Sequence, residues 1–167
     1  MPEVLPIWET LPRHSVPVRL PSQIVRILIH CTDGPREQTP AAVARFHTAA
    51  KPAGRGWPSI AYHFFVDGQG RIYKTLKNTD IGFHCKGENT ESLGVVWTGR
   101  DADTPTDAQW TALVWLVAKV LLTAYPRAQV YGHRERPSGA SQGKTCPGTH
   151  FDMDAFRTAV ALRRQQP

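Results

Sequence analysis

Two kinds of hydrophobic pattern alternate along this chain. Short apolar runs rich in β-branched residues and bounded by turn residues are typical of strands, whereas apolar residues at helical spacing indicate helices. The clearest short runs are residues 24–29 (IVRILI) and 93–97 (LGVVW). Because the second run is apolar throughout, we expect it to be a central strand with both faces covered.

Three further strands are predicted from shorter segments. Residues 61–66 and 71–74 flank the sequence DGQG, which indicates a hairpin. Residues 129–131 form another short run, which leads into Gly132 and His133. The sequence HCTDGP after the first strand is a turn signal, so His30 is expected at the end of that strand.

Helices are predicted in three places. Thr39 and Pro40 are typical of an N-cap and the first helical position. Thr106 begins a capping box followed by apolar residues at helical spacing, which predicts a long helix that stops at Pro126. Asp152 is the expected N-cap of a last helix. The pattern predicts an α/β fold: a single domain with a central mixed β-sheet of about five strands, flanked by about three α-helices.

Length and composition fit one globular domain. The chain has 167 residues, of which 41% are hydrophobic and 20% charged. Residues 1–22 hold five of the 14 prolines, so we predict a Pro-rich N-terminal arm over 1–22 and one folded domain over 23–167. No apolar run approaches about 18 residues, so no stable membrane insertion is expected. The first residues lack the pattern of a cleaved signal peptide, which predicts synthesis in the cytoplasm without one.

The charge balance is basic, with 20 Lys and Arg against 14 Asp and Glu. This excess favours polyanionic partners such as nucleic acid, an acidic membrane face or the phosphate-rich envelope of a bacterium. The basic residues are scattered, so we expect no nucleic-acid partner. Arg157, Arg163 and Arg164 in the last helix suggest weak contact with anionic envelope polymers, the alternative being an ordinary cationic helix end. A monomer is the expected state.

The chemistry-bearing residues that stand out are His30, His133 and Cys146. Both histidines follow predicted strands, and loops at one edge of a sheet can converge. Two imidazoles and a thiolate are ligands that zinc binds tetrahedrally, and three protein ligands leave the fourth position for water. The alternative is that each is an ordinary loop or core residue, because seven histidines offer many such triples.

The sequence motifs around these residues resemble those of a known protein family. Residues 61–64 read AYHF, 82–94 read GFHCKGENTESLG, 132–134 read GHR and 144–148 read KTCPG. Over roughly residues 24–160 the chain resembles the zinc-dependent N-acetylmuramoyl-L-alanine amidases of the peptidoglycan-recognition-protein superfamily, and most of all the small phage endolysins of amidase type. The resemblance implies one Zn²⁺ per chain on His30, His133 and Cys146. It also implies catalytic roles for Tyr62 and Lys144.

The implied reaction is cleavage of the amide between N-acetylmuramic acid and the L-alanine of the stem peptide. Zinc activates water and polarises the carbonyl, while the Lys144 ammonium and the Tyr62 hydroxyl can stabilise the oxyanion. The general base stays open between Tyr62, Lys144 and the zinc-activated water. Some recycling amidases of the superfamily carry a glutamate and an aspartate where this chain has Val96 and Cys146, which favours the endolysin branch.

Other residues receive weaker assignments. His84 and Asn89 match the family's groove wall, so we predict substrate contact, with an ordinary polar loop as the alternative. Trp57 is predicted to stack on a sugar ring, or else to pin its loop. The histidines His47 and His63 are interpreted as core residues. Cys31 and Cys85 are expected to be free thiols, although a disulfide between them stays open.

The sequence therefore predicts a phage or prophage endolysin that degrades bacterial peptidoglycan and acts on the cell wall after release from the host cytoplasm. One alternative is a cytoplasmic muropeptide-recycling amidase. The other is a non-catalytic peptidoglycan-binding protein, which is disfavoured because binding-only members usually lack the third zinc ligand that Cys146 matches.

Overall fold

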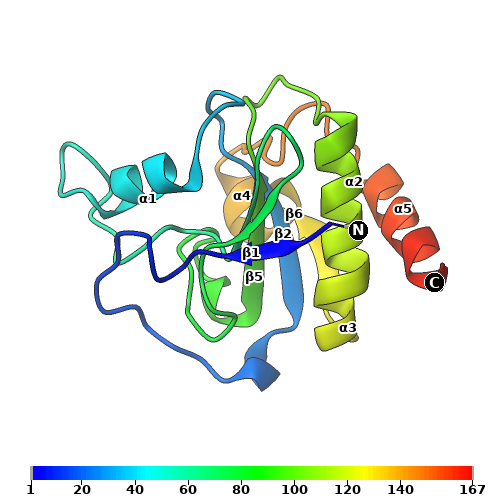
Figure 1. The fold of residues 1–167 in the computed structure, drawn as a ribbon, viewed down its shortest axis with the longest axis horizontal. Helices are drawn as coiled ribbons and strands as arrows, with labels where there is room; N and C mark the ends of the chain where they lie inside the picture. Colours follow the sequence, from blue (N-terminus) through cyan, green and yellow to red (C-terminus); the bar gives the residue numbers. More distant parts are fainter. Residues whose placement is uncertain (1, 167) are drawn as a thin grey trace.

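A computed structural model describes residues 2–166, and across that range a mixed sheet has the strand order β1-β4-β3-β5-β2-β6 (Figure 1). The strands are β1 (Val4–Pro6), β2 (Arg26–Cys31), β3 (Phe64–Val66), β4 (Ile72–Lys74), β5 (Ser92–Trp97) and β6 (Gln129–Gly132). Both β3 and β4 pair as the antiparallel hairpin expected from the sequence. The predicted α/β class is confirmed, with one strand more than expected.

Strand β5 lies near the centre of the sheet, as its apolar sequence predicted. It pairs in parallel with β3 on one side and β2 on the other, and all six of its residues are buried. Strand β2 pairs in parallel with β6 on its other side. Because β2, β5 and β6 are parallel neighbours, their carboxyl ends lie at the same edge of the sheet.

Helices cover both faces of the sheet. On one face, α2 (Asp107–Trp115), the π-helical segment η3 (Leu116–Leu121) and α3 (Leu122–Ala124) follow one another as a single rod, with α5 (Met153–Gln165) beside it (Figure 1). They bury a large apolar core against β2 and β5. On the other face, α1 (Pro40–Thr48) packs in a smaller core.

The helix boundaries largely follow the predicted caps. Thr39 and Asp152 cap α1 and α5 through their side chains, and Thr106 forms the predicted capping box with Gln109. Two features differ from the prediction. The long helix contains the π-helical segment, and a further short helix, α4 (Pro137–Ser141), lies in a stretch that contains Gly and Ser and for which the sequence predicted no helix.

The N-terminal segment packs on the domain. Strand β1 extends the sheet by pairing in parallel with β4, and Leu11 is buried in the smaller core. Arg19 is 6% exposed, and its guanidinium donates hydrogen bonds to the carbonyls of four residues that precede or begin other elements: Asn78, Asn89, Thr90 and Ser92. The segment predicted as an extended arm thus contributes a strand and a buried cation. The segment ends within the 3₁₀ turn η1 (Pro21–Gln23).

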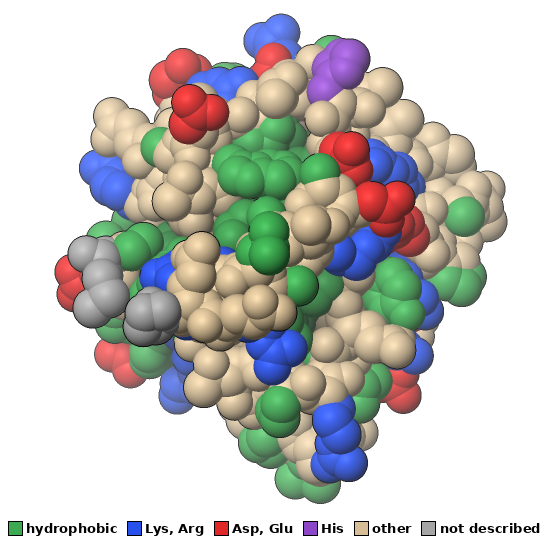
Figure 2. All heavy atoms as spheres, turned by 90° about the vertical axis from the view of Figure 1, so that its right-hand side faces the viewer, with side chains coloured by type: hydrophobic (Ala, Val, Ile, Leu, Met, Phe, Trp, Pro, Cys, Tyr) green, Lys and Arg blue, Asp and Glu red, His purple; other side chains and the backbone are tan. Residues whose placement is uncertain are grey.

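Among residues 2–166, none of the helices has both the length and the apolar character needed to cross a membrane. On the face that carries α2 and α5, Lys and Arg side chains are interspersed with Asp and Glu rather than gathered in one cluster (Figure 2).

Candidate metal centre and active site

Two neighbouring strands bring His30 and His133 together. His30 is the fifth residue of β2, and His133 begins the 3₁₀ turn η4 (His133–Glu135) immediately after β6. In the register of these strands Ile29 lies opposite Gly132, and the residue that follows each of the two is a histidine at the same edge of the sheet. The two ring centroids are 4.8 Å apart. The predicted convergence of the histidines therefore follows directly from the parallel pairing.

Cys146 reaches the same place on the loop between α4 and α5. The backbone N–H of Arg134 donates to the Cys146 carbonyl over 2.8 Å. The Arg134 guanidinium donates to the carbonyls of Thr145, Gly148 and Phe151 at 3.0, 2.7 and 2.6 Å. Arg134, the neighbour of one candidate ligand, thus holds the loop that carries another.

The three side chains form a compact donor set. The ligand atoms of His30, His133 and Cys146 all lie within 4.8 Å of one another, and Cys146 Sγ is 3.5 Å from His30 Nδ1. Burial lowers the pKa of both imidazoles, that of His30 well below its ordinary value, so both are neutral and have a free lone pair. Two neutral imidazoles and one sulfur, with room for a fourth ligand, fit a tetrahedral zinc ion.

The thiol of Cys146 needs help to become a ligand. Its hydrogen bond with Cys31 and its burial raise the pKa of the thiol well above its ordinary value. A bound metal supplies the positive charge that deprotonates such a group, since metal binding releases protons from its ligands. Cys31 and Cys85 are free thiols in the structure, as expected; Cys85 Sγ lies 3.3 Å from Ser138 Oγ.

A cavity of about 510 Å³ opens above this donor set. Its lining includes all three candidate ligands together with four residues to which the sequence assigned catalytic or substrate-binding roles, Tyr62, Lys144, Trp57 and His84. The ring centroid of Tyr62 lies 5.3 Å from that of His30, and burial raises the pKa of its hydroxyl, which is therefore a protonated donor at neutral pH. Lys144 is exposed, and its backbone N–H donates a hydrogen bond to the Gly139 carbonyl in α4.

Trp57 packs against other aromatic side chains. It stacks with Phe83 at a centroid distance of 6.1 Å and contacts the ring of His47 at 4.8 Å. The Arg55 guanidinium lies over the Trp57 ring. The tryptophan both lines the cavity and packs on its own loop, so the structure is compatible with either interpretation of this residue.

His84 and Asn89 occupy different positions from one another. His84 is 6% exposed and lies behind His30, with its Nδ1 atom 3.1 Å from His30 Nε2. Burial lowers the pKa of its imidazole to about 3. The side-chain carbonyl of Asn89, the first residue of the 3₁₀ turn η2 (Asn89–Glu91), accepts hydrogen bonds from the backbone N–H groups of His84 and Cys85. Asn89 therefore shapes the loop that carries His84.

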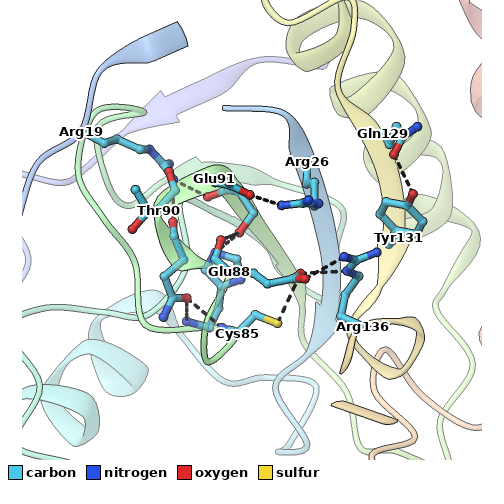
Figure 3. Close-up of polar contacts among 12 residues, drawn as sticks. Arg19, Arg26, Cys85, Glu88, Thr90, Glu91, Gln129, Tyr131 and Arg136 are labelled. Carbon is cyan, nitrogen blue, oxygen red and sulfur yellow. Dashed lines mark hydrogen bonds and ion pairs between the residues drawn. The ribbon is translucent and has the colours of Figure 1, made fainter. Parts of the chain in front are cut away.

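An ion pair that the sequence did not single out ties the two sides of the site together. The Arg136 guanidinium donates to both carboxylate oxygens of Glu88, at 2.8 and 2.7 Å, and both side chains are largely buried. Glu88 and Arg136 point toward each other across the space between the loop before β5 and the segment after β6 (Figure 3). A charged pair separated by 48 residues leaves no pattern in the sequence, so only the fold reveals it.

The structure also shows the surroundings of three further residues from the sequence analysis: His47, His63 and Arg157. His47 and His63 are buried, and each accepts a backbone N–H at Nδ1, which agrees with their interpretation as core residues. Arg157 is engaged with Glu135 and Asp154 rather than directed only to solvent.

Comparisons with known proteins agree with this architecture. The family model described as N-acetylmuramoyl-L-alanine amidase matches residues 20–149. The endolysin of Thermus scotoductus MAT2119 bacteriophage Ph2119 superposes with a TM-score of 0.79 at 30% identity, covering 95% of this chain and 99% of that one. The amidase LysCS from Clostridium intestinale has a TM-score of 0.77 at 23% identity over 96% of this chain and 97% of its own, and so supports the fold alone.

The matches to curated relatives cover a smaller share of each relative's length. Peptidoglycan-recognition protein SC2 of Drosophila melanogaster is 35% identical over 104 residues, which cover 58% of this chain and 51% of the fly protein. The chain thus spans about half the length of that relative. The endolysin of Enterobacteria phage K11 is 28% identical over 61% of this chain and 66% of its own length. Since the family match extends over most of the described domain, the chain belongs to the N-acetylmuramoyl-L-alanine amidase family.

Proposed function

We propose that this protein is a zinc-dependent peptidoglycan hydrolase that cleaves the amide between N-acetylmuramic acid and the L-alanine of the stem peptide. The observation that carries the proposal is the convergence of His30, His133 and Cys146 beneath a cavity that Tyr62 and Lys144 also line. One Zn²⁺ held by the three ligands would supply Lewis acidity and lower the pKa of a water molecule to about 7.

The chain's own residues then act on the scissile amide. Tyr62 donates a hydrogen bond from a hydroxyl that burial keeps protonated, next to the His30 ring. The exposed Lys144 ammonium, which lines the same cavity, supplies a positive charge for the oxyanion that develops there. Because Tyr62 is a poor proton acceptor under these conditions, we assign it to oxyanion or substrate binding rather than to the role of general base.

The biological setting that we propose is host lysis by a phage or prophage. Its support is the similarity to two proteins named as endolysins, one of them matched along almost its whole length. In this setting the protein is made in the host cytoplasm and acts on the wall after release. Weak contact of Arg163 and Arg164 with anionic envelope polymers, and a monomeric state, belong to the same proposal.

Two alternatives remain in view because of particular observations. Similarity to peptidoglycan-recognition proteins favours a binding module, but Cys146 completes the donor set, which a binder does not need. A recycling amidase on soluble muropeptides is the other. Beside His30 in the sheet lies Val96, which is fully buried, so no carboxylate is present at the position where some recycling enzymes have glutamate.

The test is a digest of purified sacculi with the protein, with a zinc chelator, and after zinc is restored. Mass spectrometry should find free stem peptides with a new L-alanine amine, lost on chelation and recovered with zinc. A Cys146→Ala variant is the matched control and should release none. Protein that sediments with uncut sacculi would instead establish the binding module, and cleavage confined to soluble muropeptides would establish the recycling enzyme.

A further inference from the structure

A line of hydrogen bonds runs inward from the candidate metal centre. His30 Nε2 lies 3.1 Å from Nδ1 of His84, and Nε2 of His84 lies 3.4 Å from Oγ of Ser92. Ser92 Oγ in turn lies 2.7 Å from the carbonyl oxygen of Glu88. The three side chains His30, His84 and Ser92 are 1%, 6% and 0% exposed, so water does not supply their partners.

The Glu88 carbonyl at the inner end of this line determines which group donates in each hydrogen bond. A carbonyl oxygen only accepts, so the Ser92 hydroxyl must donate its single proton to Glu88. Ser92 Oγ is then left as an acceptor, and the N–H that faces it must be on Nε2 of His84. A neutral imidazole carries one N–H, so Nδ1 of His84 has a lone pair and accepts from Nε2–H of His30.

The direction of these hydrogen bonds also determines which ring nitrogen of His30 is available to a metal. With its proton on Nε2, its lone pair is on Nδ1, which is the atom that lies 3.5 Å from Cys146 Sγ. In the opposite tautomer, Nδ1 would carry a proton that points into the donor set. We propose that His84 and Ser92 are positioning residues that hold His30 in the Nε2–H tautomer, so that Nδ1 is ready to ligate zinc. The part concerning zinc rests on the proposed function.

The protein builds a place for the His84 ring. A Cβ atom at residue 94 would lie 2.7 Å from the ring atoms Cγ and Cδ2 of His84, so only glycine in β5 allows the ring to approach the strand. From the other side, the Asn89 side chain holds the backbone N–H of His84 at 2.9 Å. Both contacts hold the imidazole against His30, where it also forms part of the cavity lining. The positioning role is additional to the substrate contact that the sequence suggested for this residue, which stays a prediction.

The tautomer can be measured directly on the metal-free protein. Two-bond ¹H–¹⁵N couplings of uniformly labelled protein distinguish a protonated from an unprotonated ring nitrogen. We expect His30 and His84 both to carry their proton on Nε2. A proton on Nδ1 of His30 would overturn the proposal, whatever the protein hydrolyses. Since this measurement involves neither zinc nor substrate, it separates the positioning role from the proposed function.

Zinc affinity tests the consequence with a matched pair of variants. His84→Asn keeps an acceptor oxygen near the position of Nδ1, whereas His84→Leu has a similar shape without it. We expect the zinc dissociation constant to rise by about 10- to 100-fold in His84→Leu, and far less in His84→Asn. Ser92→Ala should populate the second His84 tautomer in the coupling spectrum and raise the zinc dissociation constant by a smaller factor.

The thermal midpoint and the circular dichroism spectrum of each metal-free variant serve as controls that it is correctly folded. Equal zinc affinities for folded His84→Leu and His84→Asn would overturn the role of the acceptor. If the Leu variant does not fold, unchanged coupling patterns and zinc affinity in Ser92→Ala would overturn the relay by itself. Normal zinc binding without any cut in sacculi would count against the proposed function and leave the positioning role standing.

Discussion

The candidate metal centre has two halves that are held in different ways. His30 belongs to a strand that is paired on both sides, with β5 and with β6, and its ring rests on a buried histidine. Cys146 lies on a loop with no strand of its own. Its position depends on hydrogen bonds from the Arg134 backbone and guanidinium to loop carbonyls. His133 lies between the two, at the point where β6 ends.

The two halves differ in the kind of interaction that holds each ligand in position. In the strand half, backbone ladder bonds fix the main chain, and side chains only adjust the ring. In the loop half, single arginine side chains replace the ladder, because loop carbonyls have few other partners. Substitutions of supporting side chains should therefore displace the main chain of the loop half more than that of the strand half, whereas the ligands themselves should be equally necessary.

The largest expected effect tests that last statement. Cys146→Ala removes a sulfur ligand, so zinc binding and hydrolysis of peptidoglycan should fall to background. Metal content after dialysis and release of stem peptides would be measured together. Cys85→Ser, on a loop of the strand half, is the control and should keep both properties. A fully active Cys146→Ala protein would remove this residue from the donor set.

Next come the two polar residues that line the cavity from opposite halves. Tyr62→Phe and Lys144→Ala should each lower the rate of hydrolysis by about 10²- to 10³-fold, the usual loss when one group that stabilises an oxyanion is removed. Neither side chain is a ligand, so both variants should retain zinc. Hydrolysis rate and metal content are the readouts. Wild-type turnover in either variant would refute that residue's role.

Arg134 tests how strongly the loop half relies on a single side chain. Arg134→Ala removes three hydrogen bonds from a charged donor to loop carbonyls, and we expect a loss of about 2–3 kcal/mol in the free energy of unfolding. Zinc affinity should fall as well, because the Cys146 loop loosens. Urea unfolding and metal titration would show both effects. Arg164→Ala, at the exposed end of α5, should change neither; equal behaviour of the two variants would contradict the comparison.

The smallest effect concerns the ion pair that joins the halves. The hydrogen bond and charge of Arg136 lower the pKa of Glu88 in the folded protein. A carboxyl whose folded pKa is depressed stabilises the protein above the unfolded value of about 4.3, and that contribution is lost as the pH falls through the lower folded pKa. Glu88→Gln should therefore lower the free energy of unfolding at neutral pH by about 1 kcal/mol, which appears as a lower thermal midpoint. Below pH 4 the loss of stability should be smaller.

The check is a pH series of thermal midpoints for wild type, Glu88→Gln and the same substitution in an Arg136→Ala background. The pH-dependent difference between Glu and Gln should shrink once the arginine is absent. A difference that persists unchanged would mean that Glu88 stabilises the fold through another group.

Much of the fold could be predicted because it is encoded locally. The capping residues Thr39, Thr106 and Asp152, the DGQG turn and the apolar run before His30 each act over a few residues, and each structure forms where it was predicted. The misses have physical reasons. Strand β1 is only three residues long and half exposed, so it lacks a burial pattern. Helix α4 packs Gly139 against the His133 carbonyl, a tertiary contact that overrides a composition typical of loops.

The sequence by itself determined the chemical identities at the site: two histidines after strands, one cysteine, a tyrosine and a lysine, in motifs that identify the family. The tertiary structure decided their geometry. Parallel pairing of β2 with β6 places His30 beside His133, and the fold puts His84 behind His30 and Arg136 against Glu88. These contacts join residues far apart in the chain, whose partners are chosen by packing and burial rather than by any local pattern.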